Sequence, residues 1–453
     1  MSNKTPSRKF GLITTIAMIV GIVVGSGIFF RTSAILENTG GNVVMGILVF
    51  CISALGIIFG GLTVSQYAKQ DESIGGIISY CETAWGKTVA YIAGWFQTIF
   101  YYPALCAVVS WVAANYTCAL FGLPNLLING NFGFEVWILA IVYLVGASFL
   151  NTFSTKKAGI FQSISMFSKL TALFVLAVGG LFFGKPVELI TNSSQFHTTS
   201  VGFFSAIVIV AFSFDGWLIA PSIAHEIKNP KKNLPLALTI APMIITFVYL
   251  LYFIGINAFV GPENILSGVD PIVALANGLF GKYGMNIVLL FIVISVLGTL
   301  NGITMGYIRL PYTLAVRNEI PFSTQLSKIS QKYDTPIISS ILAVILALFW
   351  LLCHFLSIDG VALYNLTIFS GLEVDNLPIV LTYFFYMLLY VGVIVQSKKA
   401  SLWKRYVFPI LAIIGAGIII YGGLTQAKFN VYLIICLIGI VAGLLIRPKN
   451  VIK

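Results

Sequence analysis

Apolar runs of bilayer length recur along almost the whole chain, and they leave little choice of fold class. An α-helix needs about 20 apolar residues to cross the roughly 30 Å hydrocarbon core of a membrane. The sequence contains twelve such runs, and its 453 residues are 58% hydrophobic and only 9% charged. Soluble domains could not bury this much apolar surface. We therefore predict an all-α integral membrane protein with a single transmembrane domain and no cleaved signal peptide.

Short polar loops separate the predicted spans. The spans cover residues 10–36, 43–67, 89–121, 134–151, 157–184, 200–224, 234–260, 283–315, 336–356, 377–396, 405–424 and 429–447. A short in-plane helix is predicted over residues 75–85, and an amphipathic cover on the outer side over residues 359–376.

Lysine and arginine concentrate on alternate loops, which the positive-inside rule places in the cytoplasm. The outside segments then carry only Arg31, Lys185, Lys282 and Lys428 among the 26 basic residues, apart from two within spans. Both termini are therefore expected in the cytoplasm. Because the basic residues are divided between apolar runs, the net charge of +11 does not indicate a nucleic-acid partner.

The first predicted span is interrupted at its centre by Gly25-Ser26-Gly27. Glycine inside a helix costs about 1 kcal/mol relative to alanine. Opened backbone at this depth is tolerated only where protein buries it or where it lines a cavity. The pattern therefore predicts a broken helix that forms a binding site. The alternative is that Gly25 and Gly27 only permit close helix packing, since Gly21 and Gly25 have the small-xxx-small spacing.

A second interruption lies in the sixth span, five spans after the first. Asp215 and Gly216 occupy its middle, where an aspartate costs about 2.5–3.5 kcal/mol on insertion scales. Matching breaks in two halves of a chain indicate an inverted-repeat transporter with its substrate at the membrane midplane. The Asp215 carboxylate could contact substrate, or it could cap the outer half-helix instead.

Together the two breaks predict a site with two poles. Free N–H groups and the positive end of a half-helix attract a carboxylate, whereas free carbonyls attract an ammonium group. Such a site suits a zwitterion, namely an α-amino acid, held between apolar walls. The predicted substrate-binding residues are Ile22, Val23, Gly25, Ser26, Gly27, Ile28, Phe212, Ser213, Phe214, Asp215, Gly216 and Trp217.

Four further polar residues have alternative interpretations. Lys169, in the middle of the fifth span, could donate to the opened backbone in place of a coupling cation, carry a proton, or be a structural tie. Arg309, near the end of the eighth span, suggests a structural or gate role. Glu226 could pair with basic residues when the inside closes, or be a solvated charge. Tyr249 could direct its hydroxyl towards the broken helices, although packing or lipid contact is the favoured interpretation.

Several classes of function are excluded. Residues 179–186 nearly match a phosphate-binding loop, but Pro186 stands where a hydroxyl must bind magnesium and no strand precedes it. Ser26 and Ser213 have no acid–histidine pair that would make either a nucleophile, so we expect no enzyme. The cysteines lack metal-ligand spacing and the histidines are dispersed, so we expect neither a metal site nor a cofactor.

The quoted motifs resemble the amino acid–polyamine–organocation (APC) superfamily, in its L-amino acid transporter (LAT) branch. Residues 22–29, 212–217 and 226–235 are similar to the first span, the sixth span and the following loop of that branch, and Lys169 falls where it also carries a lysine. The chain resembles in particular bacterial serine/threonine and alanine/serine/cysteine exchangers.

The resemblance implies a LeuT-like fold of twelve transmembrane helices. A 5+5 inverted repeat would span about residues 10–184 and 200–396, with discontinuous helices 1 and 6, and residues 405–447 would form two accessory spans.

The resemblance also implies sodium-independent exchange of neutral L-amino acids across the plasma membrane by alternating access, with Lys169 replacing the ion. Proton-coupled symport is the alternative, and a channel or a non-transporting receptor is a third hypothesis. Human members of the branch bind a heavy-chain partner through a cysteine on the outer side of the membrane, in the loop that joins spans 3 and 4. Residues 120–134 contain no cysteine, so we expect no such partner beyond the amino acid substrates and the lipid bilayer.

Overall fold

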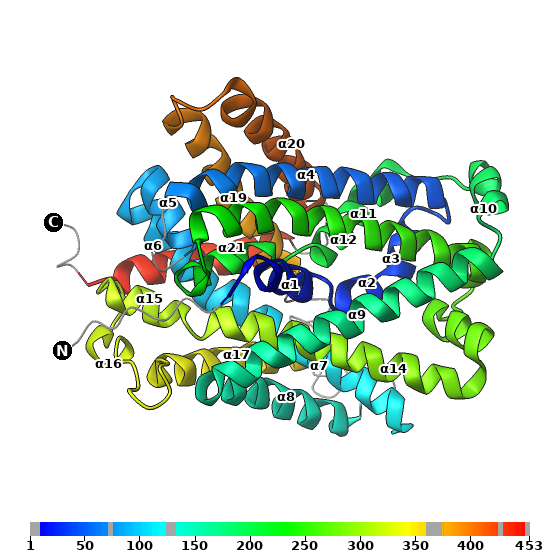
Figure 1. Ribbon diagram of the computed structural model, residues 1–453, viewed down its shortest axis with the longest axis horizontal. Coiled ribbons are helices and arrows are strands. Elements are labelled where there is room, and N and C mark those ends of the chain that lie inside the picture. The colour runs from blue at the N-terminus through cyan, green and yellow to red at the C-terminus, as the bar shows by residue number, and fades with distance from the viewer. Residues whose placement is uncertain are drawn as a thin grey trace.

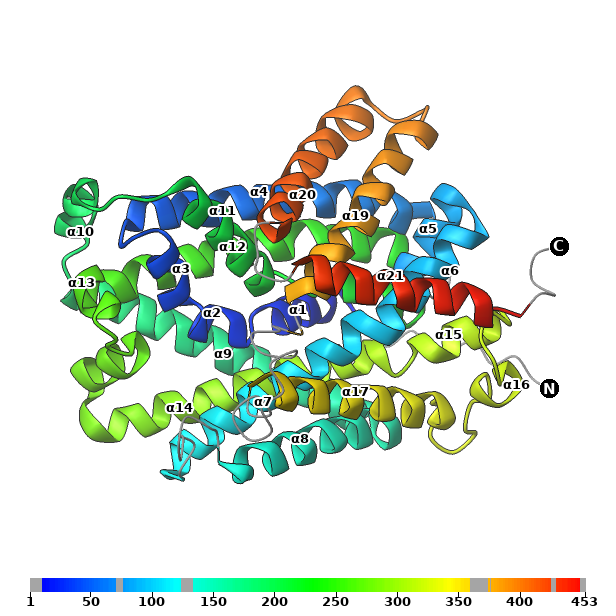
Figure 2. The ribbon, with the colours of Figure 1, turned by 180° about the vertical axis from the view of Figure 1, so that it is seen from behind.

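The computed structural model describes residues 10–70, 76–123, 133–358, 374, 376–424 and 429–448. These ranges are built almost entirely from helices (Figures 1 and 2). In chain order they are α1 (Leu12–Val23), α2 (Ser26–Phe30), α3 (Thr32–Asn38), α4 (Val43–Gln70), α5 (Ile77–Trp85), α6 (Lys87–Phe96), η1 (Gln97–Tyr101), α7 (Tyr102–Phe121), α8 (Phe134–Phe153), α9 (Thr155–Phe183), α10 (Pro186–Asn192), η2 (Ser193–Gln195), α11 (Ser200–Ser213), η3 (Trp217–Glu226), α12 (Pro230–Val260), α13 (Pro262–Leu266), α14 (Pro271–Tyr307), α15 (Leu310–Val316), α16 (Ser323–Leu326), α17 (Ile337–Ile358), α19 (Asn376–Gln396), η4 (Trp403–Val407), α20 (Phe408–Leu424) and α21 (Phe429–Ile446).

The predicted all-α membrane class is confirmed over the described residues. Ten of their helices are long and apolar enough to cross a membrane, and α1, α11 and the first part of α14 are shorter apolar helices. Large apolar side chains such as Phe167, Phe182 and Leu445 are exposed on the outer helices, as expected for surfaces that face lipid. The chain is therefore a multi-pass membrane protein.

Most helix bounds agree closely with the predicted spans. Helix α14 differs most, because it already begins at Pro271 and includes a kink at Gly281, whereas the predicted span begins at residue 283. The predicted short helix before the third span is present as α5, whereas residues 71–75 lie outside the described residues. The predicted amphipathic cover at 359–376 also falls outside them, apart from residues 374 and 376. That prediction stays untested.

The first helix lies in the interior of the bundle, where it can form a site shielded from lipid. Helices α9, α12, α14 and η3 all pack against α1, as Figure 1 shows for its central position. Nearly all of its second half is buried, including Ile19, Val20 and Ile22. At one margin, α4 packs against both α12 and α20, and α20 projects away from the body with the end of α19.

Candidate functional site

The first predicted span is broken where the glycine pattern predicted it. Helix α1 ends at Val23, Val24 and Gly25 are non-helical, and α2 begins at Ser26. A Cβ atom on Gly25 would stand 2.4 Å from Oγ1 of Thr299 on α14. Only glycine therefore lets α14 approach the broken backbone so closely. Close packing and helix breaking, the two alternatives for this glycine, both occur.

The sixth predicted span is broken as well. Helix α11 ends at Ser213, and a turn leads into the 3₁₀ helix η3. Gly216 adopts φ 91°, a left-handed conformation that residues with a side chain rarely adopt. Gly216 is also the N-cap of η3, which has no side-chain cap. The N-cap position therefore belongs to Gly216, and the choice between a capping and a substrate-binding role for Asp215 stays a prediction.

The carboxylate of Asp215 contacts the turn η1, between α6 and α7. The hydroxyl of Tyr101 donates to Oδ2 of Asp215 at 2.5 Å, from the π-helical turn η1. Asp215 is only 7% exposed, and its Oδ1 has no hydrogen-bond partner among the described residues. The neighbouring Trp217 ring packs edge-on against Tyr386 at a centroid distance of 5.6 Å. Tyr101 was not predicted as a site residue.

Tyr249 of α12 joins the two broken helices. Its hydroxyl lies 3.0 Å from the carbonyl oxygen of Val23 and 2.8 Å from that of Ser213, and its side chain is fully buried. These carbonyls belong to the last residues of α1 and α11, where intrahelical partners are missing. The favoured prediction of lipid contact or simple packing is therefore wrong, and the less favoured alternative describes Tyr249 correctly.

Lys169 of α9 lies against the opened backbone at the end of α1. Its Nζ atom donates to the carbonyl oxygen of Gly21 at 2.6 Å and to Oγ1 of Thr299 at 3.1 Å. In an unbroken helix the Gly21 carbonyl would accept from the N–H of Gly25. The break releases that carbonyl, and the ammonium group takes the vacant position. The lysine is fully buried, and these two oxygens satisfy its polar head group there.

A chain of amides extends from this point between α8, α9 and α14. The Asn301 side-chain amide donates to Oε1 of Gln162 at 2.9 Å, and the Asn151 amide donates to Oδ1 of Asn301 at 2.9 Å. A Cβ atom added to Gly21 would stand 2.8 Å from Nε2 of Gln162, so this amide lies directly against α1. The sequence has several polar residues between 298 and 304, but none of them was predicted as a site residue.

The remaining predicted residues line or adjoin the breaks. Phe214 is fully buried and packs against Tyr249 at 5.1 Å between ring centroids. Ile22 and Ile28 are buried. The Gly27 carbonyl accepts from the N–H of Arg31 at 3.1 Å.

Three predicted residues have side chains outside the described part of the structure, and only their helices can be placed. Ser26 begins α2, Phe212 lies near the end of α11, and Glu226 is the last residue of η3. Arg309 precedes α15 and donates to the Met305 carbonyl at the end of α14. This contact stabilises a helix end and does not test a gate role.

The geometry assembles backbone donors and acceptors, one buried ammonium group and one buried carboxylate around two helix breaks. Among the described residues no group of three His, Cys, Asp or Glu side chains could hold a metal ion.

Comparison with known proteins gives the family. The amino acid permease family model matches residues 10–446. Over 417 residues the chain is 27% identical to the serine/threonine exchanger SteT of Bacillus subtilis, which covers 90% of this chain and 89% of that protein. Over 346 residues it is also 27% identical to the human cystine/glutamate transporter, which covers 73% of this chain and 65% of that protein.

The fold has a counterpart among solved structures. The crystal structure of MhsT in complex with L-phenylalanine matches with a TM-score of 0.64 at 16% identity, over 92% of this chain and 99% of that chain. This likeness shows a shared fold. The family match spans nearly the whole sequence, and the relatives are transporters and not enzymes. The chain therefore belongs to the amino acid permease family of the APC superfamily, with a resemblance to its LAT-type transporters.

Proposed function

We propose that this protein is a sodium-independent antiporter that exchanges neutral L-amino acids across the plasma membrane by alternating access. The substrate would bind at the two helix breaks. Its carboxylate would accept from the N–H groups of Ser26, Gly27 and Ile28, and its ammonium group would face the carbonyls of α1 and α11. The buried rings of Phe214 and Trp217 would form the apolar walls around its side chain.

The carbonyl oxygens at the two breaks can still accept hydrogen bonds from a substrate while the Tyr249 hydroxyl contacts them. A tyrosine hydroxyl has one proton, whereas each carbonyl oxygen has two lone pairs. The oxygens of Val23 and Ser213 share that single proton. They therefore retain acceptor sites towards which an ammonium group could donate.

The observation that carries the proposal is the contact between Lys169 and the Gly21 carbonyl at 2.6 Å. In its protonated form Lys169 would place a positive charge at the broken helix, where the released carbonyls could otherwise coordinate a bound cation. A transporter with its cation built in does not need sodium to complete the site. Apolar walls and the absence of a second buried acid beside Asp215 among the described site residues favour neutral substrates.

The proposal includes a topology of twelve transmembrane helices. The ten long helices would be joined by two interrupted crossings, α1–α3 and α11–η3, at equivalent places of a 5+5 inverted repeat, with α20 and α21 as accessory spans. Both termini would lie in the cytoplasm. Figure 2 supports placing the predicted cytoplasmic loops on one side of the membrane. The end of α21 lies beside α5, α6, α15 and α16, whereas α10 and α13 lie at the opposite end of the molecule. No heavy-chain partner is expected.

Counterflow in proteoliposomes tests the proposal. Vesicles containing the purified protein would be loaded with each of the twenty amino acids in turn, and uptake of a labelled neutral amino acid would be followed with choline replacing sodium. We expect uptake only where the vesicles contain a neutral counter-substrate. Equal uptake into empty vesicles would contradict exchange, and a requirement for sodium would contradict the assigned role of Lys169.

Proton-coupled symport is a second candidate because Lys169 and Asp215 are both ionisable, buried and next to the breaks. An inward pH gradient across empty vesicles separates the two functions. Concentrative uptake driven by that gradient alone would favour symport over exchange.

A further inference from the structure

A basic cavity of about 380 Å³ lies apart from the broken helices, where α4, α12 and the segment η4–α20 meet. Four lysines line it: Lys69 near the end of α4, Lys231 and Lys232 at the start of α12, and Lys404 in η4. None of its described lining residues is acidic. The cavity therefore concentrates positive charge in a recess, and the mechanism proposed above does not use it.

The polarity of the cavity changes with depth. The lysines stand at helix ends, whereas Leu62, Leu236 and Phe408 line the part nearer the centre of the helices. With a rise of 1.5 Å per residue, Leu62 lies about 10 Å deeper along α4 than Lys69, and Phe408 about 6 Å deeper than Lys404. A cationic mouth thus leads to an apolar floor.

An apolar path continues from the floor along the outer faces of two helices. Leu236 and Met243 are exposed on α12, and Ile410 and Leu411 on α20. In a membrane these side chains face hydrocarbon, because soluble loops do not cover them. The floor of the cavity is therefore continuous with a surface suited to an acyl chain.

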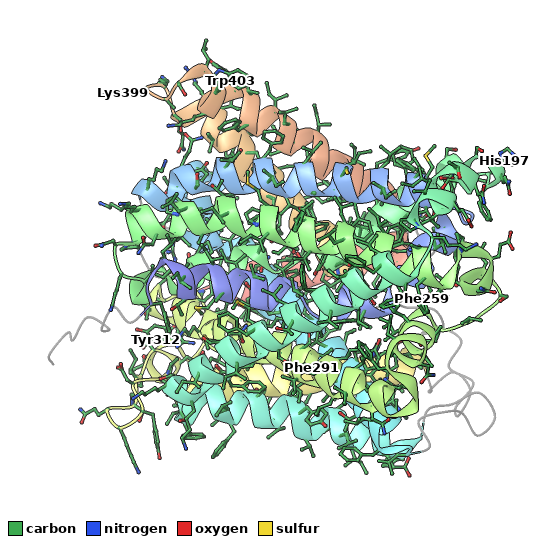
Figure 3. The ribbon with its side chains drawn as sticks, turned by 45° about the vertical axis from the view of Figure 1, so that its right-hand side comes forward. His197, Phe259, Phe291, Tyr312, Lys399 and Trp403 are labelled. Carbon is green, nitrogen blue, oxygen red and sulfur yellow. The ribbon has the colours of Figure 1, made fainter. Side chains whose placement is uncertain are left out.

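The wall formed by η4 is fixed in place and lies at the level of the membrane interface. The side-chain amide of Gln66 on α4 donates to the Lys404 carbonyl at 2.6 Å. Next to Lys404, Leu402 and Trp403 are exposed, and Figure 3 shows Trp403 at the tip where the α19–α20 pair projects from the bundle, close to Lys399. An exposed tryptophan among lysines is typical of the boundary between head groups and hydrocarbon.

We propose that this cavity binds an anionic phospholipid. The lysines hold the phosphate of the head group, and an acyl chain follows the apolar floor between α12 and α20. Basic recesses between transmembrane helices on the side that carries the positive charges bind such head groups. A free phosphate ion would satisfy the lysines but would leave the apolar floor in contact with water, so the floor favours the lipid over the ion.

Binding to the full-length protein in detergent tests the proposal. Native mass spectrometry would measure the affinity for dioleoyl-phosphatidylglycerol, with dioleoyl-phosphatidylcholine as the uncharged comparison, and competition by inorganic phosphate or glycerol phosphate would be measured alongside. The test variant is Lys69→Gln/Lys232→Gln/Lys404→Gln. The matched control is Lys156→Gln/Lys157→Gln/Lys328→Gln, whose lysines are also exposed and predicted on the same side but do not line the cavity.

Each lysine near an anionic lipid contributes about a fivefold change in affinity, so the triple variant should bind phosphatidylglycerol about a hundredfold more weakly. The control variant should stay within about twofold of the original protein, because distant exposed charges are screened. If the triple variant does not fold, Lys232→Gln alone should show the fivefold loss.

Three results would overturn the proposal. Phosphatidylcholine could bind as tightly as phosphatidylglycerol, the control could lose as much affinity as the test variant, or inorganic phosphate could compete at concentrations matching those of the lipid. The last result would identify an anion site without a lipid.

Discussion

A single side-chain amine connects the broken backbone at the end of α1 to α9. The Nζ atom of Lys169 satisfies the Gly21 carbonyl and the Thr299 hydroxyl in a fully buried place. Losing a hydrogen bond to a charged group costs about 1.5–3 kcal/mol, and here the loss falls on the segment proposed to bind substrate. The residue should therefore affect turnover more than folding.

Lys169→Met should lower the rate of amino acid exchange by about ten- to a hundredfold, the factor that corresponds to such a loss, while the protein is still purified as a monodisperse species. Counterflow in proteoliposomes measures the rate, and gel filtration checks the fold. Lys157→Met is the matched control because Lys157 is an exposed lysine on the same helix, α9. Exchange at the original rate in Lys169→Met would remove the lysine from the mechanism.

Gly27 tests the anion pole of the proposed site. A side chain at the second position of α2 would occupy the space that the proposal assigns to the substrate carboxylate, so Gly27→Val should abolish measurable binding of a labelled neutral amino acid. Gly146→Val on α8 is the control, since a Cβ there meets nothing within 4 Å. Equilibrium binding in detergent is the measurement, and affinity retained in Gly27→Val would show that the carboxylate binds elsewhere.

At the level of elements, the positions of the breaks could be predicted because the residues that cause them are costly in a membrane helix. Two glycines around a serine and an aspartate before a glycine stand out against apolar surroundings. Most helix bounds followed from run length in the same way, whereas the first part of α14, from Pro271 to Gly281, was not predicted. These signals are local, so one sequence suffices to read them.

The side chains that contact these breaks from other helices cannot be recognised from the sequence in this way. Nothing in the run around Tyr101 distinguishes the π-helical turn that directs its hydroxyl to Asp215. The 3₁₀ form of η3 is likewise not visible in its composition. Tyr249 is one of several tyrosines in apolar runs, and only the packing of α12 against α1 selects it. The site backbone was therefore predictable, whereas the side chains that tie it together were mostly not.

The Tyr249 hydroxyl, which bridges the ends of α1 and α11, should help to hold the two broken helices in their relative positions during exchange. Tyr249→Phe removes the hydroxyl that reaches both carbonyls, at a net cost of about 1 kcal/mol, and should slow exchange about fivefold. Tyr143→Phe is the control, because it removes a hydroxyl contact of 2.8 Å with Thr117 between α7 and α8. If both variants exchange amino acids at the same rate in the counterflow assay, the hydroxyl bridge does not contribute to transport.

Across the whole molecule, an ion cluster ties the last helix to the body of the bundle. The carboxylate of Glu319, buried after α15, accepts from Arg447 at 2.8 Å and from Arg317 at 3.2 Å. Arg317 also pairs with Glu82 of α5. The Arg447 guanidinium, just after α21, stacks over the Tyr91 ring at 4.6 Å from its centroid. Helix α21 is thus anchored through a carboxylate at the centre of the cluster.

Glu319→Gln tests how far the whole bundle depends on that anchor. Breaking a buried ion pair leaves uncompensated charge and costs about 3–5 kcal/mol, and here two arginines lose their shared partner. We expect a clear fall in the apparent melting temperature of the purified protein, since this cost is a large fraction of a typical folding free energy of about 5–15 kcal/mol. Glu188→Gln is the control, because Glu188 pairs with Lys185 while both side chains are largely exposed, and such pairs contribute about 0–1 kcal/mol. Equal melting temperatures for the two variants would mean that packing of α21 against α6 and α19, and not the buried charges, holds the last helix in place.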